Sequence, residues 1–106
     1  MANNFSDATV SISNNSLTDI VTASNKSMVI AGTVSNTGAT AVNITVKKYD
    51  ASASAGFSII TNAPLPVGSS LQLGKIVLQT SDKVQVQGDN SSGNLTVALQ
   101  LLTDIA

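Results

Sequence analysis

Strict alternation of apolar and polar residues is the feature of this chain that most limits what it can fold into. Val42, Ile44 and Val46 alternate with polar residues, and the stretch 95–101 has Leu or Val at every second position. A β-strand sends successive side chains to opposite faces, so a period of two predicts strands with one buried face. No stretch sustains the period of 3.6 that a helix requires, and β-branched residues are abundant. The pattern therefore predicts an all-β protein.

Strand-like segments recur at a spacing of roughly ten residues and are separated by turn signals such as Asn36-Thr37-Gly38. We expect about seven or eight short strands in an antiparallel β-sandwich that is jelly-roll-like. In the segment 27–36, the even-numbered positions from Met28 to Val34 are expected to face the core. The expected strands are 16–23, 27–36, 41–50, 57–63, 70–80, 84–87 and 95–101, with a weaker run at 9–12.

The segment 70–80 contains a change of parity. Leu71 and Leu73 share one parity, whereas Ile76 and Leu78 share the other. A β-bulge adds one residue to a strand and thereby moves the following side chains to the opposite face. A bulge near Gly74 would bring all four apolar residues to one side of the sheet.

The length of 106 residues suits one domain. Residues 1–15 are polar and rich in Asn and Ser, and we expect an N-terminal arm that is capable of flexibility. Residues 16–106 are expected to form a single β-sandwich domain. The start Met1–Phe5 has no charged region and no apolar region, so no secretory signal peptide is expected. No apolar run approaches the ~18 residues of a membrane span.

The chain contains no His, Cys, Glu, Arg or Trp. His, Cys and Glu supply most of the bases, nucleophiles and metal ligands of enzymes at neutral pH. Catalysis by a Ser–Lys pair would remain possible, but no Ser stands three residues before a Lys. We therefore expect no enzyme, no catalytic residue and no cofactor.

Asp82, Asp89 and Asn90 bracket the expected strand 84–87. Their oxygen atoms could hold Ca²⁺ if the neighbouring loops brought them together. The alternative is favoured, because Asp and Asn commonly bond to their own backbone in turns. No metal site is therefore expected.

Charged residues make up only 10% of the chain and aromatic residues 3%, with a formal net charge of −1. Such a chain has no basic field for nucleic acid or for an anionic membrane. With so few charges to guard the strand edges, association with neighbours is favoured. Outward Thr, Ser and Asn side chains suit either subunit packing or simple solvation; they are Thr33, Ser35, Asn43, Thr45 and Thr96.

Three groups of segments carry a family resemblance. They are Met1–Phe5 leading to the strand 16–23; Met28–Thr37 followed by Val42–Lys47; and Pro64–Leu71 followed by Lys75–Leu78, Asp82–Val86 and the final apolar strand. With these features in this order, the chain resembles small virion structural proteins of bacteriophages, cyanophage-like, of the capsid cement or decoration type.

The resemblance implies a β-sandwich protein of a tailed-phage virion, located on the capsid surface and made in the host cytoplasm. The implied partners are the major capsid protein and further copies of the chain, with a trimer favoured; neither nucleic acid nor membrane is expected as a partner. A neck, tail or fibre-associated module is one alternative. A carbohydrate-binding module is another, although the scarcity of aromatic residues argues against it.

Two segments are candidate contacts for the capsid or another partner. The first is the start of the arm, with Asn3, Asn4 and Phe5. The second is the proline-rich connection 64–68, in which Leu65 and Val67 could contact a neighbouring subunit. For this connection, packing over the end of the sandwich is the favoured alternative.

Overall fold

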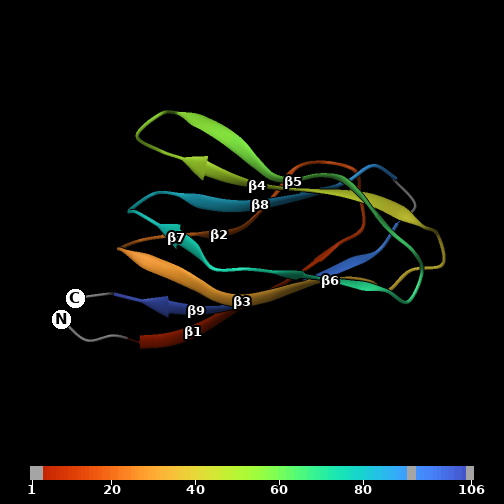
Figure 1. Ribbon diagram of the computed structural model, residues 1–106, viewed down its shortest axis with the longest axis horizontal. Coiled ribbons are helices and arrows are strands. Elements are labelled where there is room, and N and C mark those ends of the chain that lie inside the picture. The colour runs from red at the N-terminus through yellow and green to blue at the C-terminus, as the bar shows by residue number, and fades with distance from the viewer. Residues whose placement is uncertain (1–3, 91–92, 105–106) are drawn as a thin grey trace.

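Nine strands form two facing sheets in the computed structural model of this protein, which describes residues 4–90 and 93–104 (Figure 1). Every strand pair is antiparallel. The strands are β1 (Asn4–Ile12), β2 (Thr18–Thr22), β3 (Ser27–Asn36), β4 (Val42–Asp50), β5 (Ala55–Leu65), β6 (Ser70–Leu73), β7 (Ile76–Leu78), β8 (Lys83–Gly88) and β9 (Leu95–Thr103).

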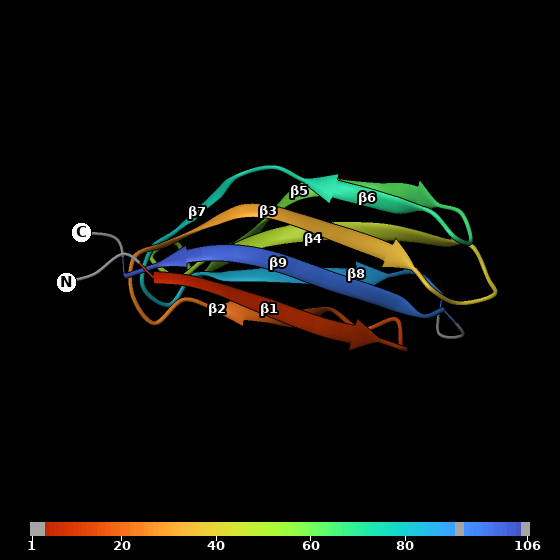
Figure 2. The ribbon, with the colours of Figure 1, turned by 90° about the horizontal axis from the view of Figure 1, so that it is seen from below.

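The strand order defines two sheets. Sheet A has the order β1-β9-β3-β6, with β7 also paired to β3, and sheet B has the order β2-β8-β4-β5. The chain crosses between the two sheets at most of its connections. In Figure 2, the strands of sheet A lie in front of those of sheet B. When β6 and β7 are counted as one interrupted strand, this is the eight-strand order of a jelly roll. The predicted all-β, jelly-roll-like antiparallel sandwich is confirmed.

The expected strand 70–80 is divided at Gly74 into β6 and β7, which together with the full-length β1 raises the number of strands to nine. Leu73, Ile76 and Leu78 are buried, and Leu71 packs against the core from its rim. All four therefore lie on the predicted side of the sheet. The chain achieves this by interrupting the strand between Leu73 and Ile76, where the two intervening residues are exposed.

The prediction of which side chains of β3 face the core is wrong for the first half of the strand. Val29 is buried, whereas Met28 is only half-buried and lies on the outer side of the sheet. The register of β3 against β9 shifts between Val29 and Ala31, so buried positions are odd-numbered before the shift and even-numbered after it. The extra residue inverts the alternation.

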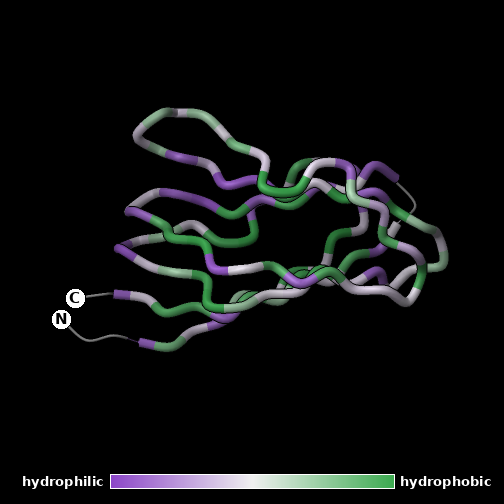
Figure 3. The backbone as a smooth tube through the Cα atoms, viewed as in Figure 1, coloured by the Kyte–Doolittle hydropathy of each residue, from purple (hydrophilic) through white to green (hydrophobic). Residues whose placement is uncertain are grey.

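The core lies between the two sheets, and apolar and polar residues alternate along their strands (Figure 3). The predicted inward positions of β4 and β9 are confirmed, because all are at most 3% exposed. Burying one such side chain stabilises the fold by roughly 1.5–3 kcal/mol. These residues are Val42, Ile44, Val46, Leu95, Val97, Leu99 and Leu101.

The N-terminal segment belongs to sheet A from residue 4 onward. β1 pairs with β9 over nine positions, from Asn4 opposite Thr103 to Ile12 opposite Leu95. Ile12 is 2% exposed and lies in the core, and Ala8 packs against it from the edge. The separation of residues 1–15 as an arm stays a prediction, and in this structure residues 4–12 form an outer strand. In the described part of the chain, no helix is long and apolar enough to cross a membrane.

Candidate functional site

The outer face of sheet A carries a row of four apolar side chains that crosses four neighbouring strands. Phe5 on β1 lies opposite Leu102 on β9, Leu102 lies opposite Met28 on β3, and Met28 lies opposite Val77 on β7. Directly opposite residues of antiparallel strands point to the same face. With strands ~4.8 Å apart, this apolar row is about 15 Å long.

The apolar row faces away from the core. Met28, Val77 and Leu102 each have a buried neighbour in their own strand, so alternation directs their own side chains outward. Phe5 is 83% exposed and Val77 is 49% exposed, and the two residues between them are half-buried. Scattered exposed apolar residues are normal on a protein surface, whereas a contiguous row of them indicates an interaction site.

Four charged residues surround the apolar row, each two positions along the chain from one of its members. Of the two acidic residues, Asp7 lies in β1 and Asp104 directly follows β9. The two lysines are exposed, and Lys26 directly precedes β3 whereas Lys75 directly precedes β7. The two ion pairs of the described residues, Lys48–Asp82 and Lys83–Asp19, involve none of these four.

Beyond the apolar row and the charged residues near it, this face is mostly polar and uncharged. Two further rows cross sheet A beyond the apolar row, and they consist of hydroxyl side chains with one Ala and one Gln. The predicted outward Thr33, Ser35 and Thr96 lie here, whereas Asn43 and Thr45 lie on β4 of the other sheet. The rows are Thr9–Ala98–Thr33–Gln72 and Ser11–Thr96–Ser35–Ser70.

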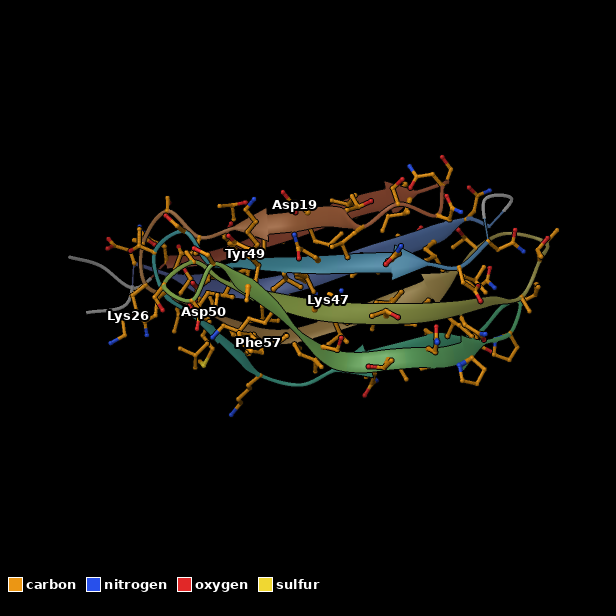
Figure 4. All side chains as sticks on the ribbon, turned by 90° about the horizontal axis from the view of Figure 1, so that it is seen from above. Asp19, Lys26, Lys47, Tyr49, Asp50 and Phe57 are labelled. Atoms are coloured by element: carbon orange, nitrogen blue, oxygen red, sulfur yellow. The ribbon has the colours of Figure 1, made fainter. Side chains whose placement is uncertain are left out.

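A second exposed apolar region lies on β5, the outer strand of sheet B. β5 has eleven residues and none of them is charged. Phe57 is 55% exposed and Ile59 is 48% exposed. The end of the β4–β5 hairpin extends apart from sheet A (Figure 1), and Figure 4 labels Phe57 on β5 and Lys47 on β4.

The middle of β5 is irregular. The register against β4 shifts on both sides of Val46, and Asn62 has a positive φ of 48°. The backbone N–H of Asn62 donates to the Thr45 hydroxyl at 3.2 Å. Such bulges interrupt the regular hydrogen bonding between the two strands and make the edge of the sheet less regular.

Asp19 and Lys83 form an ion pair on the outer face of sheet B. Gln85 Nε2 donates to Asp19 Oδ1 at 2.8 Å, and Lys83 Nζ lies 3.2 Å from Asp19 Oδ2. The Gln85 hydrogen bond is the largest cause that lowers the pKa of Asp19; burial opposes it, and the hydrogen bond and charge of Lys83 lower the pKa further. Lys83 Nζ also lies 5.5 Å from the ring centroid of Tyr49. Figure 4 labels Asp19 and Tyr49 on this side of the molecule.

The acidic side chains considered as calcium ligands accept hydrogen bonds from backbone N–H groups instead. Asp82 is buried, and its two oxygens accept hydrogen bonds from the backbone N–H groups of Ala51 at 3.0 Å and Gln79 at 2.9 Å. Asp89 Oδ1 accepts from the backbone N–H of Asn43 at 2.9 Å. Asp82 and Asp89 flank opposite ends of the extended β8, roughly 20 Å apart, so they cannot share one ion. Within residues 4–90 and 93–104, no three acidic, His or Cys side chains are grouped to hold a metal.

The predicted partner contacts are dispersed. Asn3 lies outside the described residues, Asn4 is exposed at the start of β1, and Phe5 begins the apolar row. Leu65 is a correction: it is 3% exposed in the core of its own chain, so it is not available to a partner. Val67 is 52% exposed, in the β5–β6 turn at the opposite end of the sandwich from the start of β1 (Figure 1).

Sequence reasoning missed Met28, Val77 and Leu102 as members of one surface. The available signal was the interruption of alternation by adjacent apolar residues. Met28-Val29, Ile76-Val77 and Leu101-Leu102 each place one apolar side chain inside and the next one outside. What joins them is strand register, which the local pattern does not contain.

A small pocket of about 140 Å³ lies on the β1 and β2 side, where the two sheets part. Ser6, Val21, Ser27 and Leu101 are among the residues that line it. A pocket of this size has room for several water molecules or one side chain.

No family model matches this chain, and no curated protein matches it. Among solved structures, the chain is similar to one from Bacillus endospore appendages, described as forming a novel family of disulfide-linked pili. The TM-score is 0.59 and the identity 13%, over 100% of this chain and 93% of that chain. At this identity the likeness shows the fold, a jelly-roll sandwich. The absence of Cys means that the present chain cannot form disulfide links.

Proposed function

We propose that this chain is a non-enzymatic structural subunit of a virion or another extracellular assembly, in which neighbours cover its sheet edges. The observation that carries the proposal is β5, an outer strand of eleven residues without a charge that exposes Phe57 and Ile59. Free-standing proteins usually guard outer strands with charges, above all Lys. In an assembly, the neighbouring subunit covers such an edge instead.

The finer proposal is a capsid decoration protein of a tailed phage that binds the major capsid protein and stabilises the shell. It is supported by the resemblance to small phage virion proteins and by the neutral, hydroxyl-rich faces. Apolar burial contributes about 25 cal/mol per Å², and many copies on one shell multiply that contribution. The trimer implied by the resemblance belongs to this proposal.

A second candidate is a subunit of a pilus-like filament. The likeness to the endospore appendage chain favours it, because it extends over the whole of this chain. Without Cys, the subunits of such a filament would be held by noncovalent contacts between edges and faces.

The test compares assembly of the purified chain alone with binding to shells. Sedimentation and negative-stain microscopy over a concentration series would reveal filaments. Co-sedimentation with empty shells of the major capsid protein encoded in the same genome would reveal decoration. Filaments favour the second candidate and saturable shell binding favours the first, whereas the absence of both overturns the proposal.

Variants of β5 sharpen this test. Ile59→Lys places a charge on the edge, and Phe57→Ser removes the larger exposed ring. Both are expected to weaken assembly at least tenfold with little change in stability. The matched control is Asn43→Lys, which adds the same charge at an exposed position within sheet B.

A further inference from the structure

The charges around the apolar row are arranged so that the outer face of sheet A is complementary to itself. Asp7 lies within β1, on one side of the row, and Lys75 directly precedes β7 on that same side. Asp104 directly follows β9 and Lys26 directly precedes β3, so both come at the other side of the row. The acidic residues are thus next to β1 and β9, and the lysines next to β3 and β7. The face is therefore neutral as a whole but divided into an acidic half and a basic half.

A twofold axis parallel to the strands, running between β9 and β3, would pack this face against the same face of a second copy. It places β1 opposite β7 of the other copy, and β9 opposite β3. Asp7 then meets Lys75, and Asp104 meets Lys26, each twice because the interface is symmetric. Alignment of two sheets within about 30° is the ordinary geometry of sheet-on-sheet packing.

The uncharged side chains match under the same operation. Phe5 meets Val77 and Leu102 meets Met28, so the two apolar rows cover each other. In the polar rows, Ser11 comes to lie opposite Ser70 of the other copy. Hydroxyl groups both donate and accept, so these rows can hydrogen-bond across the interface.

The face is large enough for a stable contact. Four strands at ~4.8 Å spacing and nine residues at ~3.4 Å rise give about 590 Å² per copy. Two copies together bury about 1,200 Å², which is above the ~1,000 Å² expected of a specific interface. Rotation about an axis parallel to the strands does not shift residues along the strand direction. The two faces therefore overlap over their whole length.

We propose that the outer face of sheet A is a twofold interface with a second copy of this chain, with the apolar row at its centre and the pairs Asp7–Lys75 and Asp104–Lys26 around it. The interface does not involve β5 and is independent of the function proposed for that edge. It also differs from the implied trimer, because a twofold contact produces pairs.

The experiment is native mass spectrometry and sedimentation equilibrium of the full chain and its charge variants. Wild type is expected to be a dimer or a larger even-numbered oligomer. Asp7→Lys and Lys75→Asp each turn two attractions into repulsions, so each is expected to weaken pairing roughly 10- to 30-fold. The double variant restores opposite charges and is expected to pair again.

Mixing the two single variants gives a second, independent readout. A copy with Asp7→Lys and a copy with Lys75→Asp have opposite charges at both contacts, so the mixed pair is expected to exceed either self-pair. Thermal unfolding of each variant checks that the fold is intact. A monomer, a trimer, or an even-numbered oligomer insensitive to both single variants would overturn the proposal.

The apolar contribution to the interface is tested with two variants whose side chains are almost equally exposed in the single chain. Val77→Ser removes a side chain that is 49% exposed in the row, and Ile59→Ser removes one that is 48% exposed on β5. Only Val77→Ser is expected to weaken the twofold pair. An equal effect of the two variants contradicts the assignment of the interface to this face.

Discussion

The side-chain amide of Asn36 donates from Nδ2 to the carbonyl oxygen of Leu65 at 2.9 Å, across 29 residues of chain. This bond ties the last residue of β3 in sheet A to the last residue of β5 in sheet B. The same nitrogen donates to the carbonyl of Thr40 at 2.9 Å, and Oδ1 accepts from the backbone N–H of Gly38 at 3.1 Å. One buried amide therefore closes this end of the sandwich.

Replacement of Asn36 by Asp should destabilise the protein by about 2–4 kcal/mol, because it removes two donors and turns a carboxylate towards two carbonyl oxygens. Urea unfolding followed by circular dichroism measures the loss. Asn62→Asp is the matched control at an exposed position and should change the free energy of unfolding by less than ~0.5 kcal/mol. Similar losses in the two variants would contradict the closing role of Asn36.

Asp82 should be the acidic residue most important for stability. Asp82→Ala leaves the backbone N–H groups of Ala51 and Gln79 without their acceptor, at a cost of about 2–4 kcal/mol. Asp82→Asn keeps one acceptor oxygen and should lose less. The midpoint of thermal unfolding reports the order of the variants, and exposed Asp19→Ala should lose less than ~1 kcal/mol. An Asp82→Ala protein as stable as Asp19→Ala would refute this role.

Gly32 should not tolerate a methyl group. A Cβ at this position would lie 2.6 Å from Leu99 Cδ2 and 3.3 Å from the carbonyl oxygen of Ala98, inside the packed core. Gly32→Ala should therefore cost about 1–3 kcal/mol by overpacking. At Gly74 an added Cβ meets nothing within 4 Å, so Gly74→Ala should have little effect. Chemical denaturation of both variants compares them, and a Gly32→Ala protein no less stable than Gly74→Ala would be the contrary result.

Asp19 should make stability depend on acid pH. Because its pKa is lowered below 3.8 by Gln85 and Lys83, the unfolded chain takes up the proton at a higher pH than the folded chain. The contribution is therefore present above pH 3.8 and is lost as the pH falls through the folded value. Since the carboxylate is half-exposed, the effect should be well below ~1 kcal/mol.

The measurement is the difference in free energy of unfolding between wild type and Asp19→Asn as a function of pH. It should be constant near neutral pH and shrink as the solution becomes more acidic than pH 3.8. A difference that stayed constant through this range would show that Asp19 titrates alike in both states.

The strands with uninterrupted alternation could be predicted from the sequence. Val42, Ile44 and Val46 face inward as expected, because alternation is a property of the backbone within one strand. The division of the segment 70–80 near Gly74 could also be predicted, because the apolar residues change there from odd-numbered to even-numbered positions. The absence of His, Cys and Glu likewise limited the available chemistry without any knowledge of the fold.

The tertiary structure alone decided the faces and the partners of those strands. Met28 lies outside because β3 shifts its register against β9, and Leu65 lies inside because β5 meets the end of β3 there. The apolar row exists only because Phe5, Leu102 and Met28 come to the same level on three strands. Alternation is set by neighbouring residues, whereas register is set by the packing of strands far apart in the chain, so a local pattern predicts that a strand has two faces but not what lies beside each of them.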